Sequence, residues 1–372
     1  MKDNNNIKAF FALLSAGLWG KEVQLAQYGE IDFAAIQKIA EEQSVVGLVA
    51  AGMEYIVDMK PAKKDVLQFI GQTLQLEERN KAMNYFIGVL VDKMRAGGIY
   101  MLLVKGQGIA QCYEKPLWRS CGDVDFFLTA DNYAKAQKYL IPLASSVENE
   151  EKPRMHQAMT IDPWVVELHG TMHNKFSNRI NKVLDEVQQD IFMNGGVRAW
   201  NNDGVDVFLP NPNNDVIIIF THFIGHFYVG GIGLRQICDW CRLLWTFREQ
   251  IDVSLLEKRL KAMGLIEEWK AFAAFVVEYL GMPVGAIPLF GENHNHKRLR
   301  RKADKICRLI IETGNFGHNK DESYRTKYPT IVEKSITFFR RFGEFVHLST
   351  IFPGNAPRFF FNYVFNRTKA TL

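Results

Sequence analysis

Gly122-Asp-Val-Asp-Phe-Phe-Leu128 is the most informative segment of this 372-residue chain. Its apolar second half is typical of a buried strand, and side chains alternate across a strand, so Asp123 and Asp125 project from one face. Two carboxylates this close repel each other unless a cation lies between them. Mg²⁺ (or Mn²⁺) accepts such ligation and leaves positions for phosphate oxygens. We therefore predict a divalent-metal site here. Two solvated aspartates are the alternative, although Asp is depleted in strands.

A second apolar strand is expected upstream, over residues 99–104. It runs into Lys105-Gly-Gln-Gly108 and then into the first turns of a helix over 109–114. A strand, a glycine turn and a helix start together form a place where backbone N–H groups face an anion. The glycines allow the backbone to approach phosphates, and Lys105 adds a positive charge. This turn is therefore a candidate phosphate site, although many turns contain such glycines.

A third carboxylate lies downstream in Val165-Val-Glu-Leu-His169. If this apolar segment pairs beside the Asp123 strand, Glu167 completes a three-carboxylate cluster. Such a cluster fits phosphoryl transfer in which two metals hold the attacking and leaving oxygens. An exposed strand glutamate is the alternative.

The remaining pattern divides the chain into four regions. We predict a helical lead-in over 1–95, a core of mixed strands and helices over 96–210, a helical region over 211–290, and a basic, aromatic-rich, mostly helical segment over 291–372. Within the core, strands are expected at 155–161 and 164–169, and a helix capped at Asp131 should run to Leu140. Strands and helices mixed within one segment indicate an α+β fold.

Composition excludes several classes of protein. With 47% hydrophobic residues the chain is neither disordered nor fibrous, and five cysteines are too few for a disulfide framework. The most apolar stretch, 216–234, is interrupted by histidines, so no membrane span is expected, and we predict a cytoplasmic protein. Residues 291–372 carry 16 Lys and Arg against 7 Asp and Glu, an asymmetry that points to an anionic partner or surface.

Three motifs in this order resemble a known group of enzymes. The Lys105-Gly106 turn, Arg119-x-x-Gly-Asp-Val-Asp-Phe-Phe127 and Val165-Val-Glu-Leu-His-Gly170 are similar to the DNA polymerase beta nucleotidyltransferase superfamily. The resemblance is closer to an uncharacterised bacterial nucleotidyltransferase family and covers roughly residues 30–250. It implies a small mixed sheet embedded in N- and C-terminal helices. One departure is Gly106-Gln107, where the superfamily usually has Gly-Ser.

The resemblance also implies roles for individual residues. Asp123 and Asp125 would bind the metals, and Glu167 would be the third ligand and a possible base. The expected nucleotide contacts are Lys105, Gly106, Gln107, Gly108, Arg119 and Gly122. Arg119 would reach phosphate through its guanidinium, with a structural ion pair as the alternative. His156 and His169 would orient a carboxylate or serve as acid or base, with a purely structural role as the alternative.

The expected activity is transfer of a nucleoside monophosphate from an NTP, for which we expect ATP, to an unidentified acceptor hydroxyl, with release of pyrophosphate. Another phosphoryl chemistry at the same site is one rival. A catalytically silent nucleotide-binding protein, or one that binds RNA or protein, is the other.

Three further features of the sequence could indicate other functions. His222, His226, Cys238 and Cys241 have zinc-ligand types and spacing, but the cysteines lie in an apolar helix, where Cys is often a core residue. The basic run 294–302 is a possible nucleic-acid contact, though a solvated helix face is the usual explanation and nucleic acid is not the favoured partner. Phe359-Phe-Phe361 fits either a membrane-surface contact or a packed C-terminal segment.

Overall fold

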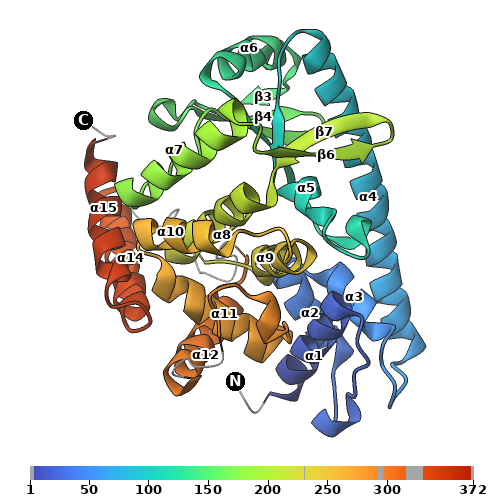
Figure 1. The fold of residues 1–372 in the computed structure, drawn as a ribbon. Coiled ribbons are helices and arrows are strands. Elements are labelled where there is room, and N and C mark those ends of the chain that lie inside the picture. The colour runs from blue at the N-terminus through green and yellow to red at the C-terminus, as the bar shows by residue number, and fades with distance from the viewer. Residues whose placement is uncertain (1–3, 230, 292–295, 316–329, 370–372) are drawn as a thin grey trace.

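The computed structural model describes residues 4–229, 231–291, 296–315 and 330–369. Within these residues no helix is both long and apolar enough to cross a membrane. The α+β class with a small mixed sheet is confirmed: five strands form one sheet and helices cover both of its faces (Figure 1).

The five-stranded sheet has the order β1-β2-β5-β4-β3. Its strands are β1 (Leu102–Val104), β2 (Asp123–Phe127), β3 (Ser146–Val147), β4 (His156–Ile161) and β5 (Trp164–His169). β2 and β5 run parallel, and the other neighbours are antiparallel. The parallel register sets Asp125 opposite Glu167. Segments 42 residues apart in sequence thus meet at the centre of the sheet.

The helices before and within the sheet region are α1 (Asn5–Trp19), α2 (Phe33–Glu42), α3 (Val46–Met53), α4 (Lys63–Ala96), α5 (Gly106–Ala110), α6 (Ala130–Leu140) and α7 (Asn178–Met193). A separate hairpin follows α7, made of β6 (Val197–Asn202) and β7 (Val205–Pro210). In Figure 1 the long helix α4 runs down one side of the molecule, from the sheet and the hairpin to the N-terminal helices.

The later helices are α8 (Pro212–Val229), α9 (Leu234–Thr246), α10 (Val253–Met263), α11 (Ile266–Leu280), α12 (His296–Thr313), α14 (Thr330–Ser349) and α15 (Asn355–Lys369). α8 and α9 lie centrally, between the sheet and the other helices (Figure 1). Their apolar side chains share one buried cluster with the N-terminal and C-terminal helices.

Alternation along the strands divides the sheet into two chemically different faces. Phe126, Val166 and Leu168 point to one face and are buried against α4 and α6. Asp123, Asp125 and Glu167 point to the opposite face, because each lies one residue away from those apolar positions. Burial of the apolar face therefore fixes the direction in which the carboxylates project.

Several predicted boundaries were wrong. The spacing of apolar residues predicts a long helix from about Leu74 to Ala96, but α4 begins earlier, at Lys63. The helix expected over 109–114 covers Gly106–Ala110 instead. Helix α6 is capped by Thr129 rather than Asp131, because Thr129 is extended and its hydroxyl accepts a hydrogen bond from the Asn132 N–H. Strand β3 and the β6–β7 hairpin were not predicted. β3 is only two residues long, and half of the residues of β6 are polar.

The basic C-terminal segment packs on the helical body. In α12, Arg300 pairs with Glu278 at 2.5 Å, and Lys302 is buried. In α15, Phe359 and Phe360 are buried whereas Phe361 is 57% exposed. The packed alternative thus describes Phe359 and Phe360, whereas residues 297, 298, 300 and 301 of the basic run are exposed, as expected for a solvated helix face. Residues 294 and 295 of that run lie outside the described part of the chain.

Candidate active site

The three predicted carboxylates meet on one face of the sheet. Asp123 and Asp125 belong to β2, and Glu167 faces Asp125 across the parallel β2–β5 pair. The Nε2 atom of His169 lies 2.8 Å from Asp125 Oδ1 and 3.5 Å from Glu167 Oε2. Asp125 Oδ1 and Glu167 Oε2 are therefore separated by no more than the sum of these two distances. A bound ion can lie between the two carboxylates. All three line a cavity of about 240 Å³.

Lys105 supplies a positive charge at the end of β1. It has φ 59° and ψ −147°, a conformation that a residue with a side chain rarely adopts. Its Nζ lies 2.7 Å from Asp125 Oδ1. Burial opposes the charged form, but the nearby charges of Asp125, Glu167 and Asp123 raise the pKa of Lys105. The ammonium thus remains charged inside the cavity.

Asp123 is the carboxylate without a direct partner, since the positive charges of Lys105 and Arg235 act on it only from a distance. Among the described residues its side chain has no hydrogen bond or ion pair. The charge of Asp125 and then burial raise its pKa. A carboxylate placed beside a like charge, without a partner, is what a cation site requires, and the oxygen donors suit Mg²⁺ or Mn²⁺. Asp123, Asp125 and Glu167 therefore fit a divalent ion.

Glu167 lies between two histidines. His156 Nε2 is 3.1 Å from its Oε2, and His169 approaches the same oxygen. Burial disfavours the ionised carboxylate, but hydrogen bonds from His156 and His169 and the charge of Lys105 lower the pKa of Glu167. Glu167 is therefore ionised at neutral pH.

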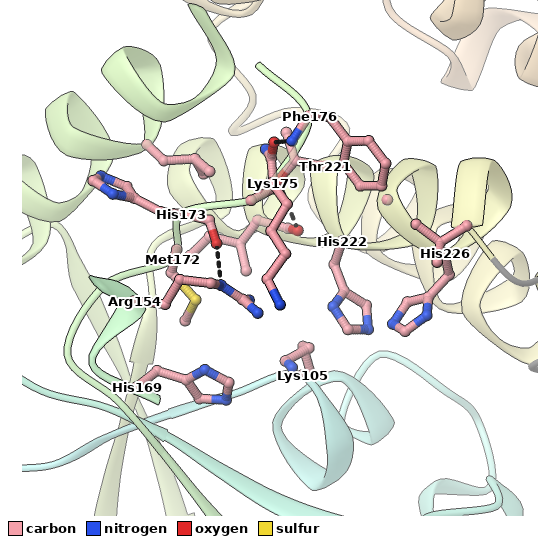
Figure 2. A pocket seen from close by; sticks show the side chains of 15 residues that line it. Lys105, Arg154, His169, Met172, His173, Lys175, Phe176, Thr221, His222 and His226 are labelled. Atoms are coloured by element: carbon pink, nitrogen blue, oxygen red, sulfur yellow. Dashed lines mark hydrogen bonds between the residues drawn. The ribbon is translucent and has the colours of Figure 1, made fainter. Parts of the chain in front are cut away.

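A second cavity, of about 300 Å³, shares Lys105, His222 and His226 with the first. Figure 2 shows the nitrogen-bearing ends of Lys105, Arg154, Lys175 and the α8 histidines directed toward this space. Arg154 is oriented by Nε donation to the His173 carbonyl oxygen at 2.9 Å. Burial and the charge of Lys105 lower the pKa of His226 to about 4. Lys105, Arg154 and Lys175 give this cavity a positive wall, whose charge is partly offset by Glu151, which pairs with Arg154 at 2.9 Å and with Lys175 at 3.2 Å.

The glycine turn is close-packed rather than open. Gly106 has φ +42°, and an added Cβ would lie 3.3 Å from Cys121 Sγ. A Cβ on Gly108 would lie 2.7 Å from the Leu209 side chain. The Gln107 amide is buried and donates to Asn80 Oδ1 at 2.7 Å. Of the turn, Lys105 and Gly106 line the carboxylate cavity.

Gly122, the remaining glycine predicted to contact nucleotide, precedes β2 and is exposed. A Cβ there would meet nothing within 4 Å.

Arg119 forms a buried ion pair. Its Nε and Nη2 donate to Asp239 at 2.9 and 2.6 Å, and the Tyr113 hydroxyl donates to the same carboxylate at 2.8 Å. Arg119 and Asp239 are 6% and 4% exposed. This geometry corresponds to the structural alternative, in which the bidentate pair joins the β2 motif to α9.

The zinc constellation is divided between two environments. His222 and His226 line the cavities, with ring centroids 4.5 Å apart. Cys238 and Cys241 are fully buried in the apolar cluster, and burial raises the pKa of Cys241 above its usual range. In the described part of the chain, the one group of three or more such side chains whose ligand atoms already lie within 4.8 Å of one another is His156, Glu167 and His169.

Three basic residues of the site escaped prediction from sequence: Arg154, Lys175 and Arg235. Arg235 lines the carboxylate cavity, its Nη1 donates to the Ser120 carbonyl oxygen at 3.1 Å, and its Nε is buried with no hydrogen-bond partner among the described residues. Arg154 and Lys175 lie just before β4 and just after β5. The sequence signal that could have identified Arg154 and Lys175 is their position next to the predicted strands.

This carboxylate-bearing mixed sheet within a helical shell defines a nucleotidyltransferase-like α+β protein. The chain belongs to the family of uncharacterised nucleotidyltransferases, whose model matches residues 29–281. This match confirms the family resemblance of the three motifs and supports a role in nucleotidyl transfer.

Among solved structures, the chain is similar to an antigenic nucleotidyltransferase-like protein from Paracoccidioides brasiliensis. The identity is 15%, the TM-score is 0.33, and the match covers 54% of this chain and 92% of that chain. Comparison with curated proteins finds no match.

Proposed function

We propose that this protein transfers a nucleoside monophosphate from an NTP to an acceptor hydroxyl, with Mg²⁺ or Mn²⁺ and with ATP as the donor. The observation that carries the proposal is the convergence of Asp123, Asp125 and Glu167 in one cavity, beside Lys105. Family membership supports the reaction class.

The proposed roles follow from position. Asp123 and Asp125 hold the metal, which when bound polarises the phosphate and neutralises charge that develops there. The acceptor oxygen attacks the α-phosphorus, and the bond from that phosphorus to the pyrophosphate oxygen breaks. Glu167, ionised and oriented by His156 and His169, accepts the proton from the acceptor hydroxyl.

The positive wall of the second cavity is the proposed site for the phosphates of the donor. Lys105 lies where the two cavities join, and Arg154 and Lys175 continue the positive charge away from the carboxylates. Charge-assisted hydrogen bonds from these groups would hold a polyphosphate. Arg235, whose Nε is buried without a partner in the described chain, would add a donor on the carboxylate side.

Pyrophosphate release tests this proposal. The full chain is incubated with each NTP, Mg²⁺ and a panel of small-molecule, RNA and protein acceptors, with the Asp123→Asn/Asp125→Asn variant alongside. Asp131→Asn is the matched control, because Asp131 is exposed and pairs with Lys135 on α6. Release by the wild type and the control but not by the double variant supports the proposal.

Release that persists in the double variant would contradict the assignment of the carboxylates. If no NTP binds, the rival holds: the fold serves interaction with RNA or protein rather than catalysis.

A further inference from the structure

We propose that His156, Glu167 and His169 form a binding site for a first-row transition-metal ion of the Zn²⁺ and Co²⁺ class. The inference goes beyond the proposed function, since it requires neither a nucleotide nor an acceptor. It shares Glu167 with that function and adds two imidazole ligands to it.

Strand geometry brings the three ligands together. β4 and β5 are antiparallel, and His156 is paired with His169 in their register. Glu167 lies two residues before His169 on β5, so its side chain emerges from the same face. The ligand atoms of the three residues all lie within 4.8 Å of one another. A site built on two adjacent strands is held more rigidly than one built on loops.

Two of the three donor–donor distances are close to those of a coordination shell. His156 Nε2 and His169 Nε2 lie 3.1 and 3.5 Å from Glu167 Oε2. Metal–ligand bonds of about 2.0–2.2 Å in a tetrahedral site set neighbouring donor atoms about 3.3–3.6 Å apart. An ion can therefore enter with small side-chain adjustments.

The surroundings supply support and access. Asp125 Oδ1, which is held by Lys105, contacts His169 Nε2 at 2.8 Å, and a bound ion would replace this hydrogen bond because the same nitrogen is the ligand. His169 is buried, whereas His156 and Glu167 are half-buried. Glu167 lines the carboxylate cavity and His169 lines the adjoining one. An ion thus has a route to the three ligands and an open coordination position toward the cavity, as in catalytic zinc sites.

The donor set determines which ion is preferred. Two imidazoles and one carboxylate suit Zn²⁺, Co²⁺ and related ions, whereas Mg²⁺ prefers oxygen ligands. Asp123 and Asp125 offer only oxygens, so the two sites differ in selectivity. Glu167 would therefore be the ligand that links the ion bound by the two histidines to the neighbouring carboxylates Asp123 and Asp125.

Co²⁺ is the probe, because its visible d–d bands report coordination. Metal-free full-length protein is titrated with CoCl₂, and we expect bands that saturate near one equivalent and survive excess MgCl₂. His156→Gln should weaken Co²⁺ binding at least about tenfold. His173→Gln is the matched control: His173 pairs with Asp185 at 2.6 Å, outside the cluster, and the variant should bind as the wild type does.

A second measurement needs no variant and so does not depend on how His156→Gln folds. X-ray absorption of the Zn²⁺-loaded wild type should show two imidazole ligands. Absence of the Co²⁺ bands, bands unchanged in His156→Gln, or a zinc shell without imidazole would each overturn the proposal. Mg²⁺-dependent pyrophosphate release without a Co²⁺ site would sink this inference alone, whereas a Co²⁺ site without NTP turnover would sink only the proposed function.

Discussion

Replacing Asp239 by Asn should destabilise the fold strongly while leaving Asp123, Asp125 and Glu167 in place, although Asp239 lines the same cavity. Asp239 accepts two hydrogen bonds from Arg119 and one from the Tyr113 hydroxyl, and both members of the ion pair are nearly inaccessible to water. Removing one partner of a buried pair leaves the other charge uncompensated, which costs about 3–5 kcal/mol. We therefore expect the free energy of unfolding of Asp239→Asn to fall by that amount.

Urea unfolding followed by tryptophan fluorescence measures this loss. The matched control is Asp131→Asn, whose exposed ion pair with Lys135 should contribute no more than about 0.5 kcal/mol. A lower midpoint with an unchanged slope would assign the effect to stability rather than to the unfolded chain. A loss below about 1 kcal/mol, accompanied by weaker NTP binding in Arg119→Met, would refute the reasoning and return Arg119 to the phosphates.

Three further predictions concern packing, pH and the cavity wall. Gly52→Ala should destabilise the protein by about 1–3 kcal/mol, because an added Cβ would lie 1.9 Å from a carbonyl oxygen of α1. Gly71 has open space around it, so Gly71→Ala should be neutral or stabilising in the same urea assay. Burial raises the pKa of Asp215 to about 6 from 3.8, so its protonated form stabilises the fold below pH 4. That contribution to the free energy of unfolding should be lost as pH rises toward 6, by at most about 1.4 kcal/mol per pH unit. In urea melts at several pH values, Asp215→Asn should lack this dependence of the unfolding free energy on pH. Lys175→Gln should weaken ATP binding about tenfold or more in calorimetry, and equal affinity to the exposed-site control Lys261→Gln would contradict the positive wall.

Local pattern predicted the carboxylate face because its geometry is local. Asp123 and Asp125 are two residues apart, and strand alternation alone places them on one side. The position of Glu167 is different, since it depends on the pairing of β5 with β2. Only the order of three motifs, and the family that they resemble, indicated that pairing.

The environment of Arg119 could not be predicted from sequence. Its partner, Asp239, lies 120 residues further along the chain, in a helix that pattern identified only as apolar. Gln107 and Gly108 likewise looked like phosphate contacts, yet they pack against Asn80 and Leu209. Burial by distant segments decides whether a polar side chain faces a cavity or the core, and no local spacing encodes that.

The presence of the helices could be predicted from the sequence, but their boundaries were predicted less well. Apolar spacing predicts helices over 216–228, 234–247, 255–263 and 267–280, and the bounds of α8 to α11 match these ranges to within a few residues. Strand β6 was missed because half of its six residues are polar and only one is buried, so it lacks the hydrophobic pattern on which strand prediction depends.

The most direct test of the proposed site is calorimetric binding of ATP with Mg²⁺, because it requires no knowledge of the acceptor. We predict binding to the wild type and to Asp131→Asn that EDTA abolishes, and loss of at least about tenfold in affinity for Asp123→Asn/Asp125→Asn, since each carboxylate would contribute a charged contact to the bound metal. Equal affinity of the double variant and the wild type would contradict the assignment of Asp123 and Asp125 as the metal and nucleotide site.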